Sequence, residues 1–181
     1  LAHRLDRDTS GCLVLGRHRK ALEDLSLLFR GGQISKTYLA VVEGRPDQNE
    51  GLIDLALQKR DAQRGWWMKV DPAGLPSQTR YHCLGTEGGL SLMALQPLTG
   101  RTHQLRVHMA AMGWPILGDP IYGLAPRQGG PVLHLHAAAV TVPLYKNKPP
   151  VNVKAPLPAH IAQTLAGLNL SVDLETLPSF E

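Results

Sequence analysis

The chain has 181 residues, of which 43% are hydrophobic and 19% are charged, with a formal net charge of +4 and a pI near 9.3. This length suits one domain with a sizeable core, and no apolar run approaches the roughly 20 residues of a membrane span. The basic charge permits a polyanionic partner without requiring one. Cys12 and Cys83 lie in strand-like apolar runs, which indicates reduced, buried thiols in a cytoplasmic protein rather than a disulfide framework.

Hydrophobic periodicity predicts the elements in chain order. Two-residue alternation and β-branched content predict strands over residues 9–16, 33–44, 51–57, 66–70, 77–84, 90–96, 132–142 and 151–154. Helical spacing of apolar residues predicts helices over residues 18–29, 102–112 and 159–168. Gly31 and Gly32 end the first helix, and Thr102 is a plausible N-cap for the second.

Many strands, few helices and no regular βα alternation indicate an α+β fold with a largely antiparallel sheet. We expect one domain over residues 1–170, followed by a flexible acidic tail over residues 171–181. No internal repeat divides the chain.

The first candidate for chemistry is the stretch HRLDRDTSG at residues 3–11, in which Asp6 stands between Arg4 and Arg7. Two neighbouring guanidinium groups favour the ionised form of a carboxylate, and an ionised carboxylate is a candidate nucleophile or base. The alternative is a plain turn held by an Asp–Arg pair, in which Asp8 or Thr9 caps the entry to the strand.

The second candidate is SKTYLAVVEG at residues 35–44. On a strand, Lys36 and Tyr38 point to the same face, where an aromatic ring can stack on a base while the ammonium meets a phosphate. The alternative is a half-buried tyrosine in a sheet with a lysine that reaches water.

The third candidate is QPLTGRTHQLRVHMAAMGWPILGDPIYG at residues 96–123. Arg101 lies near the start of a predicted helix, where an anion could be shared between its side chain and the free backbone amides. Arg106 lies one turn further along an apolar helix, where a buried carboxylate would satisfy it, and Asp6 is the obvious partner. The alternative is a solvated arginine on an open helix face.

The eight histidines call for a comparison with metal sites. His103 and His108 are five residues apart on the predicted helix, whereas helical metal pairs are usually four apart. The cysteines match no zinc spacing, and the chain has neither a Gly-rich phosphate loop nor a G-x-S-x-G nucleophile motif. The sequence therefore predicts no metal.

Together and in this order, the three stretches resemble the RluA-type pseudouridine synthase family. HRLDRDTSG resembles the family's H-R-L-D-x-x-T-S-G motif, SKTYLAVVEG its K-x-Y strand, and LTGRTHQLRVHMAAMGWPILGDPIYG its third motif. The resemblance extends over residues 1 to about 160 and implies the pseudouridine synthase fold, with a few helices flanking the sheet and a central RNA-binding cleft.

The resemblance also implies roles for individual residues. It makes Asp6 the catalytic aspartate, Tyr38 the ring that stacks on a flipped uracil, and Arg106 the partner of the catalytic carboxylate. Arg4 would enter the RNA stack. Lys36 and Arg101 would bind RNA.

The implied reaction is the isomerisation of uridines in ribosomal or transfer RNA to pseudouridine by a monomeric enzyme that needs no cofactor. The family has further strands before the first motif, which we expect to be missing from this chain. A second hypothesis is a non-catalytic RNA-binding module that keeps the fold, and a third is a metal hydrolase that uses the histidines.

Overall fold

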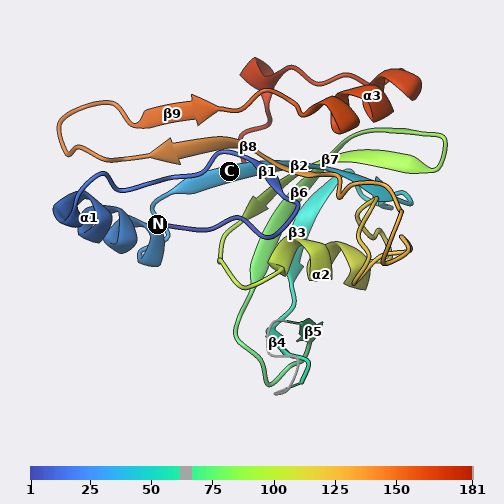
Figure 1. Cartoon of the computed structure of the whole chain (residues 1–181), viewed down its shortest axis with the longest axis horizontal. Helices are drawn as coiled ribbons and strands as arrows, with labels where there is room; N and C mark the ends of the chain where they lie inside the picture. The colour runs from blue at the N-terminus through green and yellow to red at the C-terminus, as the bar shows by residue number, and fades with distance from the viewer. Residues whose placement is uncertain (62–66, 181) are drawn as a thin grey trace.

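The computed structural model describes residues 1–61 and 67–180, and within these residues a mixed sheet carries the fold (Figure 1). The seven-stranded sheet has the order β1-β8-β2-β7-β6-β3, and β9 pairs with β8 beside β1. Its strands are β1 (Ser10–Gly11), β2 (Ser35–Glu43), β3 (Glu50–Asp54), β6 (Gln78–Glu87), β7 (Leu90–Pro97), β8 (Leu135–Val142) and β9 (Val151–Lys154). The β1–β8 pair is parallel and the other pairs are antiparallel. The α+β fold with a largely antiparallel sheet is confirmed.

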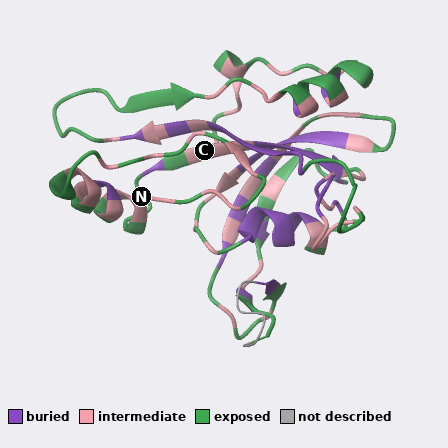
Figure 2. Ribbon diagram, in the orientation of Figure 1, coloured by how far each residue is buried: buried purple, intermediate pink, exposed green. Residues whose placement is uncertain are grey.

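Both faces of the central strands are buried, which explains why β2 and β7 read as nearly continuous apolar runs (Figure 2). Alternate side chains of β2 enter two different cores. Ala40 and Val42 pack in the cluster that includes Leu105 and Met109 of α2 (Gln104–Ala111). Leu39 and Val41 pack in the cluster that includes α3 (Ala159–Gly167). Helix α2 therefore covers one face of the sheet, and α3 covers the other.

Helix α1 (Arg19–Arg30) lies near the β8–β9 edge of the sheet, where its Leu25 shares a third cluster with Val140 and Val142. A short hairpin of β4 (Leu57–Lys59) and β5 (Met68–Val70) projects from the body beside α2 (Figure 1). After α3, a 3₁₀ turn (Leu174–Thr176) follows, and several apolar side chains of the last segment pack on the α3 core. The flexibility of residues 171–181 stays a prediction.

Three predicted elements differ from the structure. The strand predicted over residues 9–16 is confined to Ser10–Gly11, because β9 occupies the edge of β8 from Ala139 onward and leaves no ladder for the next residues. The predicted strand 51–57 divides between β3 and β4. Helix α2 begins at Gln104, and its N-cap is His103 rather than Thr102. Trp66, the predicted start of another strand, lies outside the described residues.

Every helix in the described part of the chain is too short or too polar to cross a lipid bilayer.

Candidate functional site

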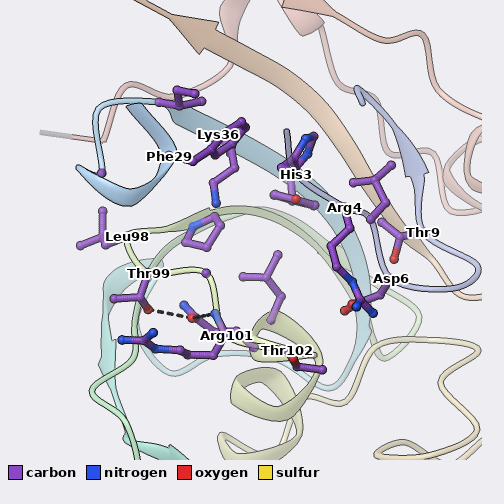
Figure 3. Close-up of a pocket in the computed structure, with 18 of the residues that line it drawn as sticks. His3, Arg4, Asp6, Thr9, Phe29, Lys36, Leu98, Thr99, Arg101 and Thr102 are labelled. Carbon is purple, nitrogen blue, oxygen red and sulfur yellow. Dashed lines mark hydrogen bonds between the residues drawn. The ribbon is translucent and has the colours of Figure 1, made fainter. Parts of the chain in front are cut away.

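A cavity of about 570 Å³ opens on the sheet face that α2 covers (Figure 3). Its wall is built from the N-terminal segment, the end of α1, the first half of β2 and the loop from β7 into α2. Residues from these segments that carry polar side chains are His3, Arg4, Asp6, Thr9, Arg30, Lys36, Tyr38, Thr99, Arg101, Thr102 and Gln104. The cavity thus collects side chains from all three stretches that the sequence singled out.

The segment that carries Asp6 is a tight turn docked on the sheet. The Thr9 amide donates to the Asp6 carbonyl at 3.1 Å, and Asp8 adopts a positive φ of 67° that aspartate tolerates in turns. Arg7 and Asp8 are exposed, whereas Asp6 is half-buried. The turn therefore separates the two carboxylates, with Asp6 in the cavity wall and Asp8 in solvent.

Gly11 allows this segment to reach the sheet. Its φ is 109°, and a Cβ at this position would lie 2.2 Å from the carbonyl oxygen of Ala137. Only glycine combines this backbone conformation with so close an approach. The glycine that ends the first motif, Gly11, is thus required by its close packing against β8.

The Asp6 carboxylate has no hydrogen-bond or ion-pair partner within residues 1–61 and 67–180. It is the one carboxylate among the described lining residues, and it faces a wall that also holds the cations Arg4, Arg30, Lys36 and Arg101. Figure 3 shows the Arg4 and Asp6 side chains extending into the same part of the cavity. The charge pattern suits a negatively charged ligand.

Lys36 and Tyr38 lie two residues apart on β2 and both line the cavity, as two-residue periodicity requires. Burial raises the pKa of the Tyr38 phenol to about 12, with a further contribution from the nearby charge of Asp6. Burial also lowers the pKa of the Lys36 ammonium. Tyr38 is therefore a neutral phenol at neutral pH, placed beside a negatively charged group.

Arg101 lies in the loop that precedes α2 and lines the cavity. Its Nε donates to the carbonyl of Pro76 at 3.2 Å, which fixes the side chain across the loop. Its backbone amide donates to Oε1 of Gln104 at 3.0 Å, and the same oxygen accepts from the Thr99 hydroxyl at 2.7 Å. The Gln104 side chain thus holds the loop before α2 in place.

Arg106 is buried, and its partner is Asp119 rather than the expected Asp6. Its Nε and Nη2 donate to the two carboxylate oxygens of Asp119 at 2.8 Å each, in a bidentate pair. Burial disfavours the charge on Asp119, but Arg106 and the amides of Ile121 and Tyr122 hold its pKa below the usual value. A solvated arginine is excluded by 4% exposure. The expectation of a buried carboxylate was correct, but the choice of Asp6 was wrong.

Arg106 does not line the cavity, although it lies within electrostatic reach of Asp6. Burial lowers the pKa of the Arg106 guanidinium, but Asp119, and to a smaller extent Asp6, outweigh burial and raise it. Asp119 lies in the short GDPIYG segment. Its carboxylate also accepts hydrogen bonds from the two amides of Ile121 and Tyr122, as aspartate does at the start of a turn, and these bonds hold it in place. The Arg106–Asp119 pair forms because this turn packs against α2, the helix that carries Arg106.

His103 and Tyr122 form a second group near Asp6, and the sequence indicated His103 only as a candidate metal ligand. His103 Nδ1 lies 2.8 Å from the Tyr122 hydroxyl, which accepts the Met68 amide of β5 at 2.9 Å. Burial lowers the pKa of His103, and the charge of Asp6 opposes this shift. The pair joins the hairpin to α2.

The histidines that were weighed as metal ligands are held by protein groups. His108 lies 2.9 Å from both the Thr79 hydroxyl and the Leu55 carbonyl, and His103 lies 2.8 Å from the Tyr122 hydroxyl. No group of three or more His, Cys, Asp or Glu side chains in the described residues could hold a metal ion. These histidines therefore have structural contacts.

The fold and the cavity agree with the comparisons to known proteins. The family model described as RNA pseudouridylate synthase matches residues 1–111, which is more than half of the chain. The chain belongs to the RNA pseudouridylate synthase family, whose members are isomerases that act on RNA.

Individual relatives bear this out. The chain is 45% identical over 160 residues to an uncharacterized RNA pseudouridine synthase of Zymomonas mobilis, covering 87% of this chain and 73% of the relative. It is 37% identical to ribosomal large subunit pseudouridine synthase C of Vibrio cholerae, covering 91% of this chain and 54% of that protein. Human RNA pseudouridylate synthase domain containing 4 superposes with a TM-score of 0.80 at 27% identity, covering 95% of this chain and 76% of that chain. The chain thus spans roughly half to three quarters of the length of these three proteins.

Proposed function

We propose that the protein converts uridine in ribosomal or transfer RNA to pseudouridine, with Asp6 as the reacting carboxylate. The observation that supports this most is the setting of Asp6. It is unpartnered within the described chain and is the one carboxylate in a wall that also carries four cations. Such a wall attracts the phosphates of RNA while leaving one carboxylate available to the ribose.

The reaction breaks the N1–C1′ bond of uridine, turns the uracil and rejoins it to the ribose through C5, after which C5 loses its proton and N1 takes one up. A carboxylate can assist in two ways. It can attack C1′ and leave when C5 forms its bond, or it can remove a ribose proton to give a glycal. Carboxylates act at comparable oxocarbenium-like centres in glycosidases. Each route uses one carboxylate oxygen of Asp6.

Tyr38 and Arg4 would serve the extruded nucleotide. A uridine within folded RNA must leave its stack before C1′ and C5 can be reached, which costs a few kcal/mol. The Tyr38 ring offers a stacking surface, and its neutral hydroxyl can donate a hydrogen bond to the uracil. Arg4 is exposed at the cavity and would fill the gap in the RNA stack, while Lys36 and Arg101 would hold phosphates.

The experiment is an isomerisation assay on the full-length protein and its Asp6→Asn variant, with Asp8→Asn as the matched control. Candidate RNAs come from pseudouridine maps of cells with and without the gene. We expect Asp6→Asn to lose at least about 10³-fold in turnover while RNA binding is retained, because only the charge is removed. Asp8→Asn should keep normal turnover, since Asp8 points to solvent. Normal turnover of Asp6→Asn would refute the assignment.

A further inference from the structure

The strand that follows Asp6 is attached to the sheet by one side-chain hydrogen bond. The Ser10 hydroxyl oxygen lies 2.8 Å from Nδ1 of His136, its register partner on β8. Within the described residues, this is the one side-chain hydrogen bond that joins residues 4–11 to another part of the chain. Ser10 comes four residues after Asp6, at the end of the turn that the Thr9 amide closes on the Asp6 carbonyl.

The partner of Ser10 is held rigidly. His136 is 2% exposed, and its Nε2 lies 3.1 Å from the carbonyl oxygen of Ala155. A carbonyl can only accept, so Nε2 carries the proton. The Ala155 amide donates to the Ala138 carbonyl at 2.9 Å, which fixes this acceptor to β8 as well.

These contacts decide the direction of the Ser10 hydrogen bond. Burial lowers the pKa of His136, so the ring is neutral at neutral pH. With the proton on Nε2, Nδ1 has a free lone pair, and the Ser10 hydroxyl donates to it. The result is a chain of two hydrogen bonds: the Ser10 hydroxyl donates to Nδ1 of His136, and Nε2 of His136 donates to the Ala155 carbonyl.

The backbone alone holds this segment weakly. The β1–β8 ladder has two residue pairs, and beyond it the Cys12 amide donates to the Ala137 carbonyl at 2.8 Å. So short a ladder tolerates small shifts along the strand. The side-chain hydrogen bond between Ser10 and His136 adds a third attachment between this segment and β8.

We propose that Ser10 and His136 form a positioning pair that sets the place of the Asp6 carboxylate relative to the nucleotide in the cavity. This inference rests on the proposed function of Asp6. Neither side chain touches the substrate. A misplacement of about 1 Å can reduce a rate by about 10²-fold, so the pair should act on the chemical step rather than on RNA binding.

The test is a double-mutant cycle of Ser10→Ala and His136→Leu in the full-length enzyme, at a temperature where all variants are folded. We expect Ser10→Ala to lower kcat by about 10- to 100-fold with KM unchanged. The double variant should be no slower than His136→Leu alone, because one change already breaks the contact. His136→Asn keeps an acceptor near the Nδ1 position and should recover part of the activity.

His134→Leu is the matched control. His134 lies two residues before His136, is 3% exposed and makes hydrogen bonds to Val132 and Thr164 rather than to the Asp6 segment. This variant should be destabilised while its folded enzyme keeps normal kcat. Normal kcat of Ser10→Ala, or an equal loss of kcat in His134→Leu, would overturn the proposal. Normal turnover of Asp6→Asn would instead overturn the proposed function.

Discussion

Two aspartates lie near the same helix and have opposite surroundings. Asp119 is fully buried and accepts four hydrogen bonds, two from Arg106 and one each from the amides of Ile121 and Tyr122. Asp6 lies in a cavity wall, and within the described residues it has no such partner. A carboxylate whose oxygens are all occupied stabilises a fold, whereas one with free oxygens can meet a substrate. In the sequence Asp6 stands between Arg4 and Arg7, whereas the arginine that pairs with Asp119 lies 13 positions away.

The largest expected effect concerns the stability that Asp119 provides. Asp119→Ala leaves the Arg106 guanidinium buried without its partner, and we expect a loss of about 3–5 kcal/mol in the free energy of unfolding. Urea denaturation followed by circular dichroism measures it. Asp8→Asn, at an exposed aspartate whose positive φ asparagine also tolerates, should stay within about 0.5 kcal/mol of the native chain. Equal stability of Asp119→Ala and the native chain would contradict the structural role of the pair.

The next effect concerns the ring beside Asp6. Tyr38→Ala removes the stacking surface, which is worth about 1–3 kcal/mol per base, so kcat/KM should fall by about 5- to 150-fold. Tyr38→Phe keeps the ring and should lose less. If the two variants lose the same activity, the hydroxyl rather than the ring carries the effect. Single-turnover kinetics on an unmodified transcript whose target uridine is known would measure both.

The loss of folding stability at acid pH provides a third test. The folded pKa of Asp119 lies below the ordinary 3.8, because Arg106 and two amides outweigh burial. The stability from this pair is therefore present above pH 3.8 and is lost as the pH falls through the folded pKa. Urea midpoints measured from pH 6 downward should fall more steeply for the native chain than for Asp119→Asn. Parallel curves would show that Asp119 has the same pKa in both states.

The smallest effect concerns the cations of the cavity wall. Binding of an RNA transcript should become less salt-dependent in Lys36→Gln and in Arg101→Gln. In each variant, the slope of the logarithm of the RNA-binding constant against the logarithm of the salt concentration should decrease in magnitude by about 0.7–0.9, as expected for one lost phosphate contact. Lys148→Gln is the control, because Lys148 lies in the exposed β8–β9 loop and outside the cavity lining. A slope that changes as much for Lys148 as for Lys36 would mean that RNA is bound over the whole basic surface.

Local patterns were enough to predict much of this molecule. Two-residue periodicity placed Lys36 and Tyr38 on one face, and both line the cavity. Apolar spacing found all three α-helices that the described chain contains. The three stretches were expected to form one cleft from family resemblance, and the cavity draws residues from each of them.

What could not be predicted depends on long-range geometry. An arginine on an apolar helix requires a carboxylate, but only the turn at GDPIYG decides that Asp119 supplies it. The early end of β1 depends on β9, which lies some 140 positions later and takes the same edge of β8. Likewise, the contact between Ser10 and His136 spans 126 positions. Such choices are made by tertiary packing, which no local pattern records.

The most direct test of the account compares Asp6→Asn and Asp119→Asn in the same preparation, with turnover and the free energy of unfolding measured on each. We predict that Asp6→Asn unfolds like the native protein and has lost turnover, whereas Asp119→Asn unfolds more easily. Normal turnover of Asp6→Asn, or a loss of its activity only in proportion to a loss of stability, would contradict the role proposed for Asp6.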